Sequence, residues 1–226
     1  MIVFLLINSN KMNLVFITSI LTTVIEPVAI ILTQKNHVSL TGKITDFAAS
    51  KFISQINNIE TNPIHIYIDS PGGDVKAGQK IIQYMNFKKN TNKTISCIAW
   101  EAHSMAFNIM QFCTYRYVLK DSKMMQHQMS LSGLSGNIEN INSYMKITNK
   151  MYDSLINDAS ARIGITPSEY KTKINNDWYL YGEEIVKNNV ADFVISSIGC
   201  DSKLTKYDST ESINSKATVI SICPLV

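Results

Sequence analysis

The sequence is poor in charge and in arginine. Only 17% of its 226 residues are charged, and the net charge is +3. Arg116 and Arg162 are the two arginines. A charge this weak, with no basic stripe interleaved with aromatic residues, argues against a nucleic-acid partner. The 45% of hydrophobic residues also exclude general disorder, because disordered chains combine low hydrophobicity with high net charge.

The four cysteines are far apart and form no CxxC pair. A structural zinc site needs ligand pairs at short spacing, so we expect no metal and no cofactor. Cys97 and Cys113 lie in apolar runs and are predicted to be buried free thiols. A reducing compartment, the cytoplasm or an organellar matrix, is therefore the default expectation.

The N-terminal region lacks an apolar run of the quality that a membrane helix needs. Residues 13–33 are apolar at 13 of 21 positions, but Glu26 and Pro27 interrupt them, whereas a spanning helix takes ~20 largely apolar residues. Three interpretations stay open for residues 1–36. They are a structured or pro-peptide-like segment, a membrane or signal element that associates through residues 1–33, or a mistaken upstream start.

From His37 onward the pattern alternates between strands and helices. Alternation of this kind predicts one α/β domain with a largely parallel sheet, at residues 37–198, followed by a tail at 199–226 that looks flexible until its apolar end. Strands are expected at 37–42, 64–69, 95–100, 116–119, 124–128 and 192–196. Helices are expected at 44–59, 75–88, 104–113, 138–163, after Pro167 and at 182–188. The helix at 44–59 is expected to bury Ile44, Phe47, Ala48, Phe52, Ile56 and Ile59.

Two strand-to-helix junctions carry residues suited to chemistry. Ser70-Pro71-Gly72-Gly73 follows the strand at 64–69, and paired glycines let backbone N–H groups approach an anion or a developing oxyanion. Ser104 follows the strand at 95–100, where a helix N-terminus would favour a nearby anionic intermediate. The plain alternatives are a tight turn at the glycines and a helix N-cap at the serine.

A serine nucleophile needs a base, and the base needs a carboxylate that orients it. Of the four histidines, His65 lies inside a predicted strand and His103 is next to Ser104 in the chain. His127 ends a strand-like run before a Ser/Gly loop and is the best-placed general base. Asp177, before Trp178, is the candidate carboxylate.

Four segments together resemble the Clp-type serine peptidases, the ClpP family, in the same order along the chain. They are IYIDSPGGDVKAGQKIIQYM, EAHSMA, MMQHQMSLSGLSGN and NNDWYLYGEEIVKNNVADFVI. The resemblance covers about residues 38–196. It departs from the family where His103 replaces a small residue and where Met129 replaces proline.

The resemblance implies a ClpP/crotonase-like fold of repeated β-β-α units with a long handle helix. It implies a Ser104–His127–Asp177 triad that cleaves unfolded polypeptides. It also implies an oxyanion hole made by the backbone N–H groups of Gly73 and Met105. Extended substrate would pair with the backbone near the first glycine turn and near the loop after the histidine, at Gly72, Asp74, Val75, Ser130, Leu131 and Ser132.

The long helix at 138–163 bears an apolar stripe with seven-residue spacing, which suits either an ordinary core or an assembly face. The stripe is Ile138, Ile141, Met145, Thr148, Tyr152, Leu155 and Ala159. The resemblance implies a homo-oligomeric heptamer or double heptamer, fed by an AAA+ ATPase. Two other functions stay open: a catalytically silent ring subunit, and a crotonase-type acyl-CoA enzyme, which does not need the triad.

Overall fold

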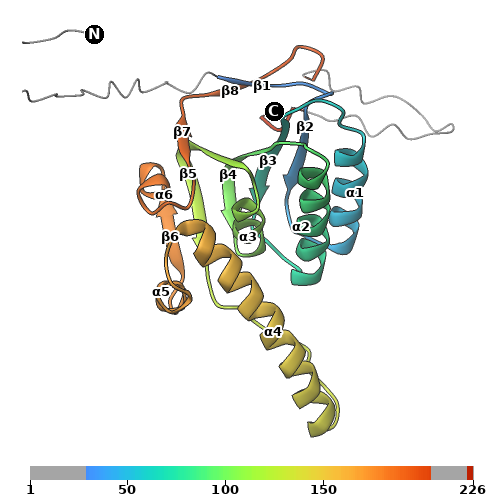
Figure 1. Ribbon diagram of the computed structural model, residues 1–226, viewed down its shortest axis with the longest axis vertical. Coiled ribbons are helices and arrows are strands. Elements are labelled where there is room, and N and C mark those ends of the chain that lie inside the picture. The colour runs from blue at the N-terminus through green and yellow to red at the C-terminus, as the bar shows by residue number, and fades with distance from the viewer. Residues whose placement is uncertain (1–28, 205–222, 226) are drawn as a thin grey trace, which may run out of the picture.

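The computed structural model describes residues 29–204 and 223–225 as an α/β fold, which confirms the predicted fold class (Figure 1). Its main sheet has the strand order β2-β3-β4-β5-β6, and β7 also pairs with β5. All of its pairings are parallel except that of β5 with β6. The strands are β2 (His37–Thr41), β3 (Ile64–Ser70), β4 (Ile95–His103), β5 (Tyr115–Gln126), β6 (Trp178–Tyr181) and β7 (Phe193–Ile195).

Four of the six described helices begin where the sequence offers a capping side chain. Thr45, Asp74 and Asn137 each accept a hydrogen bond from the first turn of the helix that follows. Thr166 and Glu169 form a capping box. The helices are α1 (Asp46–Asn57), α2 (Val75–Asn90), α3 (Met105–Gln111), α4 (Ile138–Ile163), α5 (Pro167–Lys173) and α6 (Glu183–Lys187).

Three details differ from the sequence-based expectation. The segments expected as separate strands at 116–119 and 124–128 form one strand, β5. The strands β1 (Ile30–Leu32), β6 and β8 (Ile198–Cys200) were not predicted, because a run of three or four residues carries little periodic signal. Phe47 is 79% exposed, so its predicted burial on α1 is wrong, and Ala49 takes the core position instead.

The sheet is buried on both faces. One apolar core lies between the sheet and the helices, and it includes Ile66 of β3 and Phe107 of α3. A second cluster on the opposite face joins Tyr67 and Ile98 to Leu32 of β1 and to Cys223. This two-sided burial explains why β3 and β4 read as nearly continuous apolar runs.

A β-bulge shifts the register of the strands that carry the functional residues. Ala99 pairs with Val118, but Glu101 pairs with Lys123, so extra residues bulge out between the two pairs. The hydroxyl of Ser122 holds the bulge, because it accepts from the N–H of Leu119 and donates to the carbonyl of Ala99, each at 2.7 Å. Beyond the bulge, the ends of β4 and β5 lie side by side.

All four cysteines are paired, as Cys97–Cys113 and Cys200–Cys223. The prediction of free thiols at Cys97 and Cys113 is therefore wrong. The two cysteines are 16 residues apart in the sequence. The β4–α3–β5 crossover returns the chain to the start of β4 and leaves 5.9 Å between their Cα atoms. A reducing compartment was expected because the cysteines were predicted to be unpaired, and the two disulfides remove that reason.

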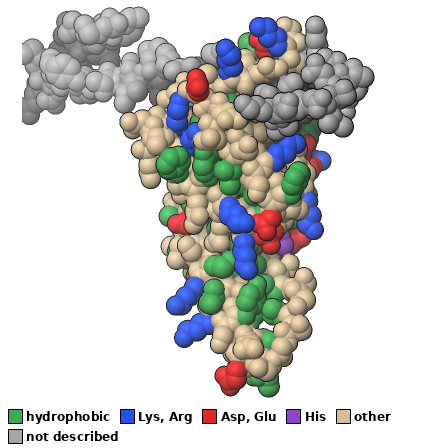
Figure 2. Space-filling view, turned by 90° about the vertical axis from the view of Figure 1, so that its right-hand side faces the viewer, with side chains coloured by type: hydrophobic (Ala, Val, Ile, Leu, Met, Phe, Trp, Pro, Cys, Tyr) green, Lys and Arg blue, Asp and Glu red, His purple; other side chains and the backbone are tan. Residues whose placement is uncertain are grey.

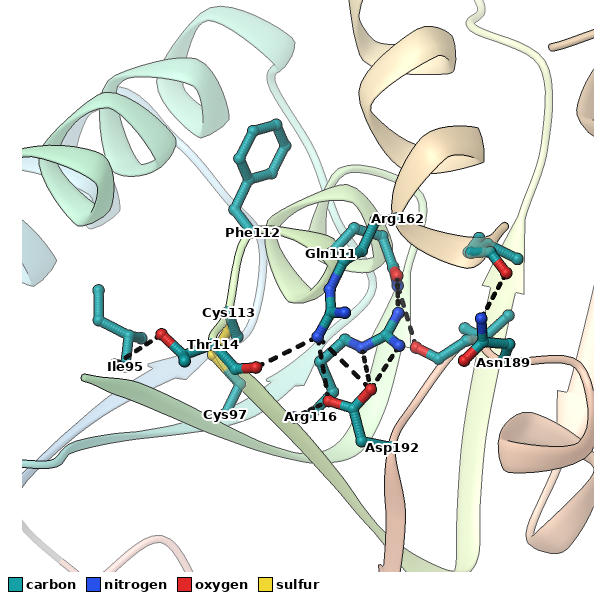
Figure 3. A network of polar contacts seen from close by, with 12 residues as sticks. Ile95, Cys97, Gln111, Phe112, Cys113, Thr114, Arg116, Arg162, Asn189 and Asp192 are labelled. Carbon is teal, nitrogen blue, oxygen red and sulfur yellow. Dashed lines mark hydrogen bonds and ion pairs between the residues drawn. A yellow bond between two sulfur atoms is a disulfide. The ribbon is translucent and has the colours of Figure 1, made fainter. Parts of the chain in front are cut away.

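A buried ion-pair network joins three secondary-structure elements and the segment before β7 (Figure 3). The Arg116 side chain is fully buried and donates to Asp192 Oδ1 at 2.6 Å and to Gln111 Oε1 at 2.6 Å. Arg162 of α4 reaches the same carboxylate at 3.1 Å. The network therefore links β5, the end of α3, α4 and the segment that enters β7.

The N-terminal half of α4 projects away from the body (Figure 1). Ile138 is 76% exposed and Ile147 is 62% exposed, whereas Leu155 and Ala159 further along are buried in the core. Figure 2 shows hydrophobic side chains on this projecting part, interspersed with basic ones. Among residues 29–204 and 223–225, no helix is long and apolar enough to cross a membrane.

Candidate active site

Ser104 lies on a strained turn between β4 and α3. Its φ of 53° and ψ of −116° fall in a region that non-glycine residues rarely adopt, at a cost of about 1–3 kcal/mol. The backbone holds the turn, because the Ser104 N–H donates to Met125 of β5 at 2.8 Å and the Ser104 carbonyl accepts from Asn108 at 3.2 Å. The hydroxyl makes no capping hydrogen bond to α3, so the N-cap interpretation fails.

The hydroxyl of Ser104 instead meets His127. The Oγ atom lies 2.9 Å from Nε2 of the imidazole. His127 is the first residue after β5, and its backbone N–H donates to the side chain of Gln126 at 3.0 Å. A serine hydroxyl at this distance from an imidazole nitrogen can pass its proton to the ring.

The glycine turn packs directly against Ser104. A Cβ atom added to Gly72 would lie 2.8 Å from the Cβ of Ser104 and 2.9 Å from the backbone nitrogen of Met105. The N–H of Gly72 is anchored on Ser70 Oγ at 3.1 Å. Gly73 pairs with Ile44 in an isolated bridge, and an added Cβ would clash with the Ile44 backbone. The two glycines are therefore required by close approach as well as by their positive φ.

Within the described part of the chain, two backbone N–H groups near the serine have no acceptor. Gly73 and Met105 line the same pocket as Ser104, and neither N–H donates to any residue that the structure describes. The N–H of Met105 is free because it begins α3. Donors left over in this way suit an oxyanion that forms beside Ser104.

Asp177 is not joined to His127 by a hydrogen bond. It is exposed, and within the described ranges it makes no hydrogen bond or ion pair. The antiparallel ladder ends at the pair of Gln126 and Trp178, and His127 and Asp177 are the first residues beyond it on each strand.

The remaining expected substrate-binding positions fall into two groups. Asp74 has its groups occupied, since its N–H donates to Ile44, its carbonyl accepts from Gly78 and its carboxylate caps α2. Ser130, Leu131 and Ser132 are exposed and make no hydrogen bonds to other described residues. Val75 and Ser130 line the pocket beside Ser104.

His103 does not enter the pocket. Its ring contacts Tyr179 of β6 edge-on at 6.5 Å, and it is absent from the pocket lining. Its Nε2 atom is buried without a hydrogen-bond partner among the described residues. Nearby, burial and then the charge of Glu101 raise the pKa of Asp69, while His103 lowers it. The histidine that replaces the family's small residue therefore does not crowd Ser104.

The pocket itself was not predicted. Besides Tyr152 and the lining residues already named, it has six apolar residues, here called the apolar wall, and three polar residues, here called the polar trio. The apolar wall is Val75, Met105, Met129, Leu155, Ile156 and Ile174. The polar trio is Asn108, Gln126 and Tyr170. Glutamine within a β-strand and asparagine within a short apolar helix are local inconsistencies that could have signalled it.

The fold and this junction site define an α/β protein with a serine and a histidine in contact where β4 and β5 end. Comparison with known protein families identifies the family of this chain, because the model of the Clp protease family matches residues 23–197. The match covers more than three quarters of the chain. The chain therefore belongs to the Clp protease family, a family of peptidases.

Proposed function

We propose that this chain is a serine-type endopeptidase that cleaves unfolded polypeptides with Ser104, His127 and Asp177. The observation that carries the proposal is the 2.9 Å contact between Ser104 Oγ and His127 Nε2, made by a hydroxyl that does not cap its own helix. The strained turn at Ser104 supports it, because strain of this kind is retained where position matters to chemistry.

The proposed reaction begins when Ser104 Oγ attacks the substrate carbonyl carbon and its proton passes to His127 Nε2. The carbonyl oxygen becomes an oxyanion, and the N–H groups of Gly73 and Met105 stabilise it. His127 then returns the proton to the leaving amine as the peptide bond breaks. Water hydrolyses the resulting acyl-serine by the same steps. Asp177 orients the imidazole once its side chain turns toward Nδ1.

The proposed substrate-binding mode is addition of an extended strand. The unpaired backbone of Ser130, Leu131 and Ser132 supports it, because an extended peptide needs free N–H and carbonyl groups to pair with. The N–H and carbonyl groups of Gly72 and Asp74 are already paired within the fold, so pairing on the glycine side would fall to Val75.

We also propose that the chain assembles into a homo-oligomeric ring, a heptamer or double heptamer, served by an AAA+ ATPase. The exposed apolar residues on the projecting half of α4 support assembly, because side chains such as Ile138 and Ile147 favour burial against a partner.

Labelling with a fluorophosphonate probe tests the enzymatic proposal. The folded parent chain should label, and Ser104→Ala should not. Ser154→Ala, a matched change at an exposed serine on α4, should label like the parent. A folded parent that does not label would favour the catalytically silent ring subunit. Hydrolysis of acyl-CoA thioesters without peptide cleavage would favour the crotonase-type enzyme.

A further inference from the structure

The pocket beside Ser104 combines the apolar wall with the polar trio. The hydrogen bonds of the trio have defined donors and acceptors. Gln126 is its centre, with only 4% of its surface exposed. Its Nε2 group donates to Asn108 Oδ1 at 3.1 Å and to the Tyr170 hydroxyl at 3.1 Å. Its Oε1 accepts from the backbone N–H of His127 at 3.0 Å.

The backbone of His127 fixes the orientation of both amides. A backbone N–H can only donate, so the atom of Gln126 that faces it must be the oxygen. The Gln126 nitrogen must then face Asn108, and a nitrogen that donates requires the Asn108 oxygen opposite it. Flipping either amide would place two donors against each other. Each amide in the trio therefore has a single satisfactory orientation.

Within the polar trio, this wiring leaves two donor groups unpaired. The oxygen of Asn108 is occupied by Gln126, so its free polar group is the NH₂. The Tyr170 oxygen accepts from Gln126, so its free group is the hydroxyl hydrogen. Neither group donates to a residue within the described part of the chain. Unmatched donors that a bound ligand desolvates cost free energy unless the ligand supplies an acceptor.

The residue types that line the pocket limit which kind of hydrogen-bond acceptor a ligand can place there. No lysine, arginine, aspartate or glutamate lines the described pocket, so a substrate carboxylate would be desolvated without a counter-cation. Burial raises the pKa of Tyr170 far above its ordinary value, so its hydroxyl stays a donor at neutral pH. A purely apolar side chain would match the apolar wall but leave the donors of Asn108 and Tyr170 unpaired.

We propose that this pocket selects a substrate residue with an apolar stem and a neutral terminal carbonyl, glutamine above all, immediately before the scissile bond. The methylene stem would pack along the apolar wall, and the amide oxygen would accept from Asn108 and Tyr170. Asn108 is one helical turn beyond Ser104, and both residues line the pocket. The inference rests on the proposed peptidase function and adds its substrate preference.

The test uses fluorogenic peptides that differ only in the residue before the cleaved bond: glutamine, leucine or glutamate. We expect the parent to cleave after glutamine with a kcat/KM at least about tenfold above the other two. Asn108→Leu, which replaces the donor by an apolar group of similar size, should lose this preference or favour leucine. Asn149→Leu, the same change at an exposed position of α4, should keep the parent profile.

A second variant covers the case in which Asn108→Leu fails to fold. Tyr170→Phe removes only the hydroxyl, and it should lower the ratio of cleavage after glutamine to cleavage after leucine. A parent that labels with fluorophosphonate but cleaves after leucine as well as after glutamine would overturn the preference alone. A folded parent that neither labels nor cleaves would overturn the peptidase function, and the preference with it.

Discussion

Gly72 packs so closely against Ser104 that a Cβ atom on Gly72 would lie 2.8 Å from the Cβ of the serine and 2.5 Å from the carbonyl oxygen of His103. The glycine turn can therefore approach Ser104 this closely only because Gly72 has no side chain. Because the opposing atoms include backbone, the turn could accept a methyl group only by moving Ser104.

We expect Gly72→Ala to abolish fluorophosphonate labelling or to reduce its rate more than about tenfold, since a misplacement near 1 Å is enough for a large loss. Gly42→Ala is the matched control. Gly42 also has a positive φ, but an added Cβ would meet nothing within 4 Å. Equal labelling of the two variants would contradict the argument.

Asp177 should contribute through His127 alone. In Asp177→Asn the amide cannot stabilise the imidazolium and can favour the wrong tautomer, so peptide cleavage should fall by a factor on the order of 100 or more. KM should change little. Asp158→Asn, at an exposed position of α4, should cleave like the parent. A parent-like rate in Asp177→Asn would remove Asp177 from the proposed mechanism.

The buried pair of Arg116 and Asp192 should stabilise the fold. Asp192→Asn leaves the fully buried guanidinium without its counter-charge, which should lower the free energy of unfolding by about 3–5 kcal/mol. Urea unfolding at neutral pH measures the loss. Asp153→Asn breaks the exposed pair with Lys171 instead and should cost less than about 1 kcal/mol.

The same pair predicts a loss of stability in acid. Burial alone would raise the pKa of Asp192, but hydrogen bonds and charge attraction from Arg116, aided by Arg162, outweigh it and hold the pKa below its ordinary value. A carboxyl whose pKa is lowered on folding stabilises the fold above its unfolded pKa of about 3.9. This stability should be lost as the pH falls below about 4, and Asp192→Asn should show a weaker acid dependence. Parallel pH profiles would contradict the assignment.

The Cys97–Cys113 disulfide should contribute measurably to stability. Closing a loop of 16 residues lowers the conformational entropy of the unfolded chain, which raises the free energy of unfolding by about 3 kcal/mol. Urea unfolding of Cys97→Ser/Cys113→Ser against the parent, both without reductant, measures this contribution. Mass spectrometry of an unreduced digest should recover the 97–113 and 200–223 linkages. Four free thiols in the unreduced protein would refute both pairings.

Assembly should depend on the projecting half of α4. Ile147→Asp places a charge on an exposed apolar position, so light scattering should show a smaller particle than the parent gives. Asn149→Asp adds the same charge at a neighbouring polar position and serves as the control. A parent that is a stable monomer would rule out the proposed ring.

Local pattern was enough to predict much of this molecule. The α/β alternation and the full extent of α4 follow from periodicity and capping residues, which depend on neighbours in the chain. The same holds for Ser104, since a strand followed at once by a short helix places it on a junction.

Contacts between distant segments were decided only by the tertiary structure. The polar trio joins residues from α3, β5 and α5, and no spacing rule relates Asn108 to Tyr170. The disulfides and the exposure of Phe47 depend likewise on how elements cross and which surface stays uncovered. The sequence by itself determined that a serine and a histidine follow separate strands. Only the folded sheet, through its bulge and its β4–β5 register, brought them within 2.9 Å, because that distance depends on the pairing of segments more than 20 residues apart.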